Sequence, residues 1–264
     1  MRFRDKKIVI TGAAGVYGRG LATAFANAGA RLALSDIRRD GLEEVKRALK
    51  LPDSRVLLHA TELTDAASIQ ALVTTVVQQW GAPDVVVNNA GIYPFHGLLE
   101  TDAAQWDRVM DVNLRAPFLI IQGFARAMLE RGVRGCFINV SSASADVLRT
   151  NGVPYCVSKR GLEWLTKGFA LDLGPDGIRV NAVRPGFAFG GAGVEFPEGY
   201  ADAITEANPM RRVGTPADLA EAVMFLASEH ASYVTGEVLS ADGGSSISRR
   251  MGAATEARRG AGRA

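Results

Sequence analysis

A tyrosine and a lysine four residues apart, Tyr155 and Lys159, stand in a segment whose apolar residues follow the period of a helix. Side chains at this spacing lie on one helix face, one turn apart. A phenol has a pKa of about 10, too high for a base at neutral pH, and a neighbouring ammonium group favours its ionised form. The pair is therefore suited to acid/base chemistry on an alcohol or carbonyl oxygen. Alone the pattern is weak, because it also occurs among ordinary surface residues.

A glycine-rich turn near the N-terminus, Thr11–Gly18, follows an apolar run and opens another helical pattern. Glycines in such a turn let the backbone approach the pyrophosphate of a dinucleotide, whose charge then lies at the helix N-terminus. An ordinary tight turn between strand and helix is the competing interpretation. Asp36 favours nucleotide binding, because it ends the next apolar run, where a carboxylate can accept hydrogen bonds from an adenosine ribose.

Asp36 also bears on the choice of cofactor. A carboxylate at this point repels a 2′-phosphate, so the sequence predicts NAD in preference to NADP. Arg38 and Arg39 follow closely and weaken that preference. The alternative is that Asp36 only caps a loop.

Short apolar runs, most of them continuous, alternate with helical patterns along the chain. The runs are Lys7–Thr11, Arg31–Ser35, Arg55–His59, Val85–Asn88, Cys136–Val140, Arg179–Val183 and Glu237–Ser240. The helical patterns lie near residues 17–29, 40–50, 66–80, 102–131, 154–173 and 216–228, with Thr64-Asp65 and Thr215-Pro216 as starts and Gly29, Gly81 and Gly174 as stops. The alternation predicts an α/β fold, a parallel sheet with helices on both faces.

The domain organisation follows from the same pattern. Residues 1–248 contain no linker or repeat and are predicted to form a single dinucleotide-binding and catalytic domain. Within it, residues 184–215 are rich in glycine, proline and aromatics without a strong period, which is typical of a functional loop, and we expect a substrate loop at about 187–214. Residues 249–264 are a basic tail of alanine, glycine and arginine, expected to be a solvated terminus.

Composition argues against several classes of protein. The net charge is +2, and residues 249–264 alone carry +4, so the rest of the chain is slightly acidic and unlike a nucleic-acid binder. No run approaches the ~20 apolar residues of a membrane helix, and the basic N-terminus lacks the apolar stretch of a signal peptide. Cys136 and Cys156 give neither a disulfide framework nor metal-ligand spacing. We expect a cytoplasmic protein without a metal or a membrane partner.

Several motifs together resemble the short-chain dehydrogenase/reductase family. They are TGAAGVYG from Thr11, NNAG from Asn88, Asn113, Ser141-Ser142, Tyr155-x-x-x-Lys159, Pro185-Gly186 and the closing YVTGEVLSADGG. The resemblance covers about residues 5–247. It implies a Rossmann-like doubly wound fold of about seven parallel strands in the order 3-2-1-4-5-6-7.

The resemblance implies a catalytic set of four residues. Tyr155 would exchange a proton with the substrate oxygen, and Ser142, thirteen residues earlier, would hydrogen-bond that oxygen. Ser141 would then be part of the strand end. Lys159 would bind the nicotinamide ribose and lower the pKa of Tyr155, and Asn113 would hold a water in a relay from Lys159 to solvent.

The expected cofactor is NAD, on the argument from Asp36, and the resemblance places further residues around it. Its predicted contacts are Gly12, Gly15, Tyr17, Gly18, Asp36, Ile37, Glu62, Leu63, Asn89, Ala90, Gly91, Tyr155, Lys159, Pro185, Gly186 and Ala188. The chain departs from the family at two positions. Val16 stands where glycine is usual, and since a β-branched residue resists positive φ, Gly15 could take that conformation instead. Gly190 replaces a threonine that commonly contacts the cofactor.

The substrate is less well defined. Candidate walls of its pocket are Tyr93, Phe95, His96, Ser144, Arg149, Asn151, Phe187, Phe189, Glu195, Phe196 and Tyr200. This mixture favours a sugar, a polyol or another polar secondary alcohol. Arg149 could bind an anionic substrate and His96 could donate a second proton, although a solvated loop residue is the simpler interpretation of each.

Three functions compete. The first is an NAD-dependent dehydrogenase of a secondary alcohol, and the second is a carbonyl reductase of the 3-oxoacyl type, against which Asp36 argues. The third is a regulatory protein that binds a dinucleotide without chemistry, against which the intact catalytic set argues. The resemblance also implies that the helices at 102–131 and 154–173 contact partner subunits in a homotetramer, or in a homodimer.

Overall fold

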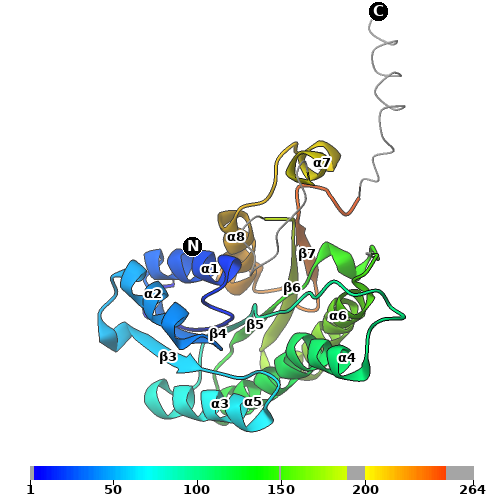
Figure 1. The fold of residues 1–264 in the computed structure, drawn as a ribbon. Coiled ribbons are helices and arrows are strands. Elements are labelled where there is room, and N and C mark those ends of the chain that lie inside the picture. The colour runs from blue at the N-terminus through cyan, green and yellow to red at the C-terminus, as the bar shows by residue number, and fades with distance from the viewer. Residues whose placement is uncertain (1–2, 149, 189–199, 248–264) are drawn as a thin grey trace, which may run out of the picture.

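The computed structural model describes residues 3–148, 150–188 and 200–247. These contain a parallel sheet in the order β3-β2-β1-β4-β5-β6-β7, and this confirms the predicted doubly wound α/β fold (Figure 1). Its strands are β1 (Lys7–Thr11), β2 (Arg31–Asp36), β3 (Val56–Ala60), β4 (Val85–Asn88), β5 (Cys136–Val140), β6 (Arg179–Pro185) and β7 (Val238–Ala241). The predicted apolar runs match these strands to within two residues at either end.

Helices cover both faces of the sheet. They are α1 (Val16–Asn27), α2 (Arg39–Leu49), α3 (Ala66–Trp80), α4 (Ala103–Met110), α5 (Ala116–Glu130), α6 (Val153–Leu173), α7 (Tyr200–Ala207) and α8 (Pro216–Ala227). Successive strand residues point to opposite faces. Ile8 and Ile10 therefore pack with α1, α2 and α8 in one apolar core, whereas Val9 packs with α3, α5 and α6 in the other.

Local sequence explains where several helices begin and end. Asp65 accepts a hydrogen bond from the Ala67 amide at 2.9 Å and so caps α3. Thr215 caps α8 and forms a reciprocal pair of hydrogen bonds with Asp218. Gly81 ends α3 at a φ of +75°, which favours glycine. These starts and stops confirm the sequence prediction.

Two segments differ from the expected pattern. The helix expected over 102–131 is interrupted by a π-helical turn, Asp111–Arg115, between α4 and α5. The segment 184–215, expected to be irregular, contains the eight-residue helix α7. This helix is too short for the periodicity of its apolar residues to stand out among the surrounding glycines and prolines.

The topology gathers the motifs at one edge of the sheet. All strands are parallel, so their carboxyl ends lie along the same edge. Thr11, Asp36, Asn88, Val140 and Pro185 end β1, β2, β4, β5 and β6 there. The chemistry-bearing segments that follow these strands are therefore brought together.

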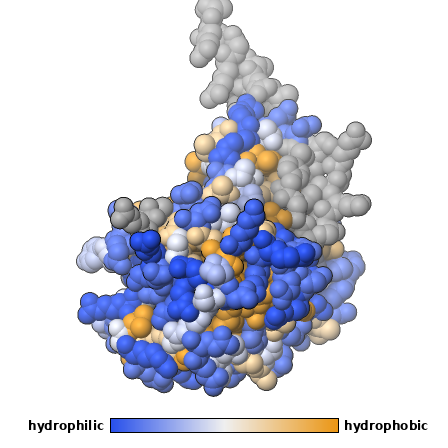
Figure 2. Space-filling view, turned by 90° about the vertical axis from the view of Figure 1, so that its left-hand side faces the viewer, coloured by the Kyte–Doolittle hydropathy of each residue, from blue (hydrophilic) through white to orange (hydrophobic). Residues whose placement is uncertain are grey.

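The outer surface is mostly polar where Figure 2 shows it. That view looks at the side on which α2 and β3 lie in Figure 1, and hydrophilic residues dominate it, with apolar residues gathered near its centre. Within the described ranges, every helix is too short or too polar to cross a membrane.

Candidate active site

The glycine-rich turn after β1 is closely packed against the segment that follows β4. Gly12 has a φ of +62°, and a Cβ there would lie 2.8 Å from the Cα of Ala90. A Cβ at Gly18 would lie 2.7 Å from the Cα of Ala13. Contacts this short are not tolerated, so both positions require glycine for close backbone approach. The predicted role of these glycines in shaping the turn is thus explained by packing.

The N-terminus of α1 has no side-chain cap. Gly15 is its N-cap residue and provides no side chain to accept hydrogen bonds from the first-turn amides. Those amides carry partial positive charge, which suits a phosphate. Gly15 has a φ of −76°, so the expectation that it takes positive φ in place of Val16 is wrong. The left-handed residue of the turn is Gly12, and Val16 simply begins the helix.

Asp36 lies beside this turn. Its side chain is 9% exposed, and its two carboxylate oxygens accept hydrogen bonds from the amides of Ala14 and Arg38, both at 3.0 Å. Arg38 places its Nε 3.7 Å from Asp36 and donates from Nη2 to the carbonyl oxygen of Ala14 at 3.0 Å. A carboxylate with unused lone pairs and a half-exposed guanidinium therefore both lie beside the glycine-rich turn.

The predicted cofactor contacts Ile37, Glu62 and Leu63 differ in what their side chains do in the structure. Ile37 is 59% exposed, directly after Asp36. The carboxylate of Glu62 accepts hydrogen bonds from the amide and the hydroxyl of Thr64, both at 3.0 Å. Leu63 packs against the apolar core on the α3 side. Glu62 thus stabilises its own turn and keeps one oxygen for another donor.

The segment after β4 is tied to the glycine-rich turn. The hydroxyl oxygen of Thr11 accepts hydrogen bonds from the amides of Asn89 and Ala90 at 3.1 and 3.2 Å. The Asn89 amide group donates to the carbonyl oxygens of Thr11 and Gly12. These bonds fix the predicted cofactor residues of the two segments relative to each other.

Gly91 joins this region to the predicted catalytic residues. A Cβ at Gly91 would lie 3.3 Å from Nζ of Lys159 and 3.4 Å from Oδ1 of Asn113. The lysine amine and the asparagine amide therefore both border the Gly91 backbone. The structure brings together three residues that are widely separated in the sequence.

Asn113 lies in the π-helical turn and is fully buried. Its Oδ1 accepts a hydrogen bond from the amide of Ile92 at 2.9 Å, and its Nδ2 donates to the carbonyl oxygen of Ile92 at 2.8 Å and to the hydroxyl of Ser158 at 3.1 Å. Both amide hydrogens are used, and Oδ1 keeps one lone pair for a water. π-Turns are frequent at functional sites, and this one aims Asn113 at α6.

Lys159 is buried on α6. Its Nζ donates to the carbonyl oxygen of Val140 at 2.8 Å and lies 5.8 Å from the ring centre of Tyr155. Burial lowers the pKa of Lys159 from 10.5 to about 8. The ammonium form is therefore destabilised compared with an exposed lysine, and an acceptor or an anion nearby stabilises it.

The two serines after β5 point to different partners. Ser141 donates from its hydroxyl to Oε1 of Glu163 at 2.8 Å. Ser142 accepts from the amide of Ser144 at 3.1 Å and caps a short 3₁₀ turn, Ala143–Ala145. The hydroxyl proton of Ser142 is therefore not used in that bond. This division agrees with the predicted choice of Ser142 as the substrate contact, which stays a prediction.

Tyr155 is half-buried in the first turn of α6, and its ring meets that of Tyr93 edge-on at a centre-to-centre distance of 6.1 Å. Tyr93 in turn meets Phe95 at 6.4 Å. The aromatic residues predicted as a substrate wall thus continue outward from Tyr155. His96 beside them is exposed.

The loop after β6 is anchored to α1. The hydroxyl of Tyr17 donates to the carbonyl oxygen of Gly186 at 2.6 Å, and burial raises the pKa of Tyr17 well above its usual value, so this donor stays protonated. The carbonyl oxygen of Phe187 accepts from the amide of Gly214 at 2.7 Å. Pro185, Gly186 and Ala188 are thereby held near the glycine-rich turn.

Other predicted residues are less clearly connected to the site. Ser144 is buried, and Asn151 is exposed with a φ of +59°. Arg149, Phe189, Gly190, Glu195, Phe196, the side chain of Tyr200 and the tail 249–264 lie outside the described residues.

The sequence analysis missed two groups of residues. Leu98, Leu99 and Leu148 expose large apolar side chains in the loops that follow Tyr93 and Ser142. Glu163 on α6 and Arg184 near the end of β6 form an ion pair that is largely shielded from solvent. Glu163 follows Tyr155 and Lys159 at four-residue intervals on α6, and that spacing was the available signal.

Comparisons with known proteins agree with this geometry. The family model described as enoyl-(acyl carrier protein) reductase matches residues 12–246. A 3α-hydroxysteroid dehydrogenase of Mediterraneibacter gnavus is 35% identical over 245 residues, 92% of this chain and 98% of its own length. A D-threitol dehydrogenase of Mycolicibacterium smegmatis is 34% identical over 247 residues, 93% of this chain and 95% of its own length.

A solved structure is also similar to this chain in fold. The crystal structure of a short-chain type dehydrogenase/reductase from Mycobacterium marinum aligns with a TM-score of 0.86 at 31% identity, covering 92% of this chain and 96% of that one. The chain belongs to the short-chain dehydrogenase/reductase family, a family of oxidoreductases that use nicotinamide cofactors.

Proposed function

We propose that the protein is an NAD-dependent dehydrogenase of a secondary alcohol, able to reduce the corresponding carbonyl in reverse. One observation carries the proposal: the buried amine of Lys159 lies beside both the Tyr155 ring and the Gly91 backbone, where Asn113 also points. An acid/base pair is thus set next to the backbone that the cofactor would follow. A protein that only bound a dinucleotide would have no chemical need for this arrangement.

The cofactor residues fit a dinucleotide. The uncapped N-terminus of α1 would receive the pyrophosphate, and Asp36 would accept hydrogen bonds from the adenosine ribose. The Asp36 carboxylate would repel a 2′-phosphate and so supports NAD. Arg38 opposes this, but its guanidinium is already engaged with Asp36 and with the carbonyl oxygen of Ala14.

The roles of the side chains follow from their donors and acceptors. In alcohol oxidation, Tyr155 as phenolate would accept the hydroxyl proton of the substrate, and Ser142 would hydrogen-bond the same oxygen. Lys159 as ammonium would favour the phenolate, and Asn113 would hold a water that returns the proton toward solvent. The nicotinamide, when bound, supplies the chemistry of hydride transfer. These residues would also hold the reacting carbon in place, which lowers the entropic cost.

The residues predicted to line the substrate pocket bear on the substrate class. The polar residues that favour a sugar or polyol include Arg149 and Glu195, which lie outside the described residues. The described wall next to Tyr155 is aromatic, with Tyr93 and Phe95 in line. We therefore put secondary alcohols with an apolar body first, as the hydroxysteroid relative suggests, and polyols second, as the threitol relative suggests.

Association with other copies is part of the proposal. Val157, Trp164 and Leu171 expose apolar side chains at seven-residue intervals along α6, and Phe118 on α5 is also partly exposed. A stripe of this kind favours burial against a second copy, and so supports the predicted homotetramer or homodimer. A molar mass from light scattering would test this. The cytoplasmic location stays a prediction from the sequence.

The proposal is tested by following cofactor reduction with purified protein. Apolar secondary alcohols, polyols and a 3-hydroxyacyl thioester are offered separately, each with NAD and with NADP. The expected result is turnover of a secondary alcohol with NAD. Turnover of the thioester alone, with NADP, would favour the 3-oxoacyl reductase. If no substrate is turned over with either cofactor but NADH binds tightly, the result would favour the regulatory protein.

A further inference from the structure

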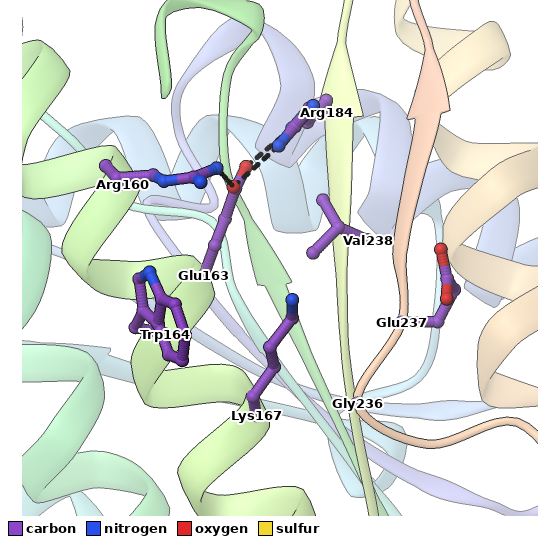
Figure 3. Close-up of a pocket in the computed structure, with 8 residues that line it drawn as sticks. All are labelled: Arg160, Glu163, Trp164, Lys167, Arg184, Gly236, Glu237 and Val238. Atoms are coloured by element: carbon purple, nitrogen blue, oxygen red, sulfur yellow. Dashed lines mark hydrogen bonds and ion pairs between the residues drawn. The ribbon is translucent and has the colours of Figure 1, made fainter. Parts of the chain in front are cut away.

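A buried carboxylate, that of Glu163, lies in the middle of α6 and is 3% exposed. Oε1 accepts a hydrogen bond from Nε of Arg184 at 2.6 Å and from the hydroxyl of Ser141 at 2.8 Å. Oε2 accepts from Nη2 of Arg184 at 2.6 Å and from Nη1 of Arg160 at 3.3 Å. Figure 3 shows the two arginines approaching this carboxylate from opposite sides.

A second carboxylate extends the cluster toward the substrate side. Asp146, just after the 3₁₀ turn that Ser142 caps, pairs with Nη1 of Arg160 at 2.7 Å and with Nη1 of Arg184. The cluster therefore links four segments: the end of β5, the turn 143–146, helix α6 and the end of β6. These segments carry Ser142, Tyr155 and the Pro185-Gly186 loop.

The ion pairs of this cluster, which consists of Asp146, Arg160, Glu163 and Arg184, differ in how well they are shielded from solvent. The Glu163–Arg184 pair is bidentate and shielded, since the Arg184 side chain is 12% exposed, and such charge-assisted bonds are short and geometrically specific. Asp146 and Arg160 are much more exposed, so solvent screens their interaction. Removing one member of the shielded pair would leave the other buried charge without its partner. The rigid centre of the cluster is therefore Glu163 with Arg184.

The cluster also forms the floor of a hollow of about 190 Å³ between α6 and β7, lined further by Trp164, Lys167 and Glu237. Of the two carboxylates that line it, Glu163 is paired with both Arg160 and Arg184. The cluster matters for the candidate active site because Glu163 accepts the hydrogen bond of Ser141, the residue next to Ser142. Ser141 also lies near the carbonyl oxygen of Lys159, at 3.5 Å from its hydroxyl.

We propose that Glu163 and Arg184 are positioning residues for the acid/base centre. Glu163 holds Ser141, and through the chain its neighbour Ser142, at a fixed place relative to Tyr155, two helical turns earlier on the same helix. Arg184 directly precedes Pro185-Gly186 and fixes the start of that loop against α6. The inference rests on the proposed function, in which Ser142 and Tyr155 contact the same substrate oxygen.

The test compares Glu163→Gln, Ser141→Ala and Arg184→Lys with a matched control, Arg179→Lys. Arg179 lies at the opposite end of β6, where its guanidinium donates to the carbonyl oxygens of Leu226, Ser228 and Val234. The control makes the same substitution on the same strand, but far from Ser142. For every variant kcat, KM, NADH affinity and urea unfolding are measured, with hydrogen exchange of the amides in segment 141–147.

Glu163→Gln and Arg184→Lys are expected to lower kcat by about ten- to a hundredfold, because misplacement by about 1 Å has this effect. In Glu163→Gln, NADH affinity should change by less than about twofold, because the residues expected to bind the adenosine half are untouched. In Arg184→Lys, the loss of NADH affinity should be smaller than the loss of kcat, because Arg184 also fixes the start of the Pro185-Gly186 loop. Exchange in segment 141–147 should become faster. Ser141→Ala should lower kcat in the same direction with little loss of stability, and Arg179→Lys should reduce stability without changing kcat or that exchange.

The inference is overturned if folded Glu163→Gln or Ser141→Ala keeps a kcat within about twofold of the unmodified protein. It is also overturned if Arg179→Lys lowers kcat as much as Arg184→Lys, since the effect would then be a general loss of stability. If the unmodified protein turns over no substrate, the proposed function fails. In that case, unchanged exchange of segment 141–147 in Glu163→Gln overturns the positioning role separately.

Discussion

The amine nitrogen of Lys159 lies 2.8 Å from the carbonyl oxygen of Val140, the last residue of β5. This bond ties α6 to the strand that leads into Ser141 and Ser142. It also uses only one of the three hydrogens of the ammonium group. The amine thus has a fixed place in the protein and keeps two donors for the ribose and for water.

The burial of Lys159 predicts a dependence of stability on pH. Its pKa is lowered from 10.5 to about 8, so between these values the folded protein binds fewer protons than the unfolded chain. Stability attributable to Lys159 therefore rises with pH across this window, by roughly 3 kcal/mol in total. In Lys159→Met this rise should be missing. Urea unfolding of both proteins at a series of pH values measures the difference, and a difference that stays constant from neutral to alkaline pH would contradict the assignment.

The glycine-rich turn gives a prediction with an internal control. Gly18→Ala places a Cβ 2.7 Å from backbone Ala13 and should reduce NADH affinity by more than about tenfold, because the turn must open. Gly168→Ala, in α6, meets no atom within 4 Å and should stabilise the protein by up to about 1 kcal/mol with NADH affinity unchanged. Fluorescence titration with NADH distinguishes them. Equal NADH affinity in the two variants would be inconsistent with the turn as the pyrophosphate site.

The relationship between Asp36 and Arg38 predicts the cofactor preference. Asp36→Ala removes the carboxylate that repels a 2′-phosphate and releases the Arg38 guanidinium, so the ratio of kcat/KM for NAD to that for NADP should fall. Adding Arg38→Ala should remove much of the gained NADP activity. Steady-state assays with both cofactors measure these ratios. An unchanged ratio in Asp36→Ala would mean that Asp36 does not face the ribose.

Much of the architecture was predictable because buried parallel strands leave continuous apolar runs. Strand β1 shows this well, since Ile8 and Ile10 face one core and Val9 the other. Helix starts were equally clear where a side chain caps them, as Asp65 and Thr215 do. The strand order came from the resemblance to the family and was confirmed.

The remaining features depend on contacts that a pattern does not encode. The π-helical turn at Asn113 was hidden, because its residues continue the helical period on both sides. The conformation of Gly15 was misassigned, because the positive φ of the turn belongs to Gly12, where Ala90 of the segment after β4 leaves no space for a Cβ. The pairing of Glu163 with Arg184 joins residues twenty-one positions apart, and only the fold brings them together.

The most direct test of the central claim compares the unmodified protein with Tyr155→Phe. Turnover of the preferred alcohol with NAD is measured for both, beside NADH binding and urea unfolding. If Tyr155 is the acid/base, the variant loses about 10²- to 10⁴-fold in kcat while folding and binding NADH normally. A folded variant that binds NADH and keeps near-normal turnover would show that another residue moves the proton.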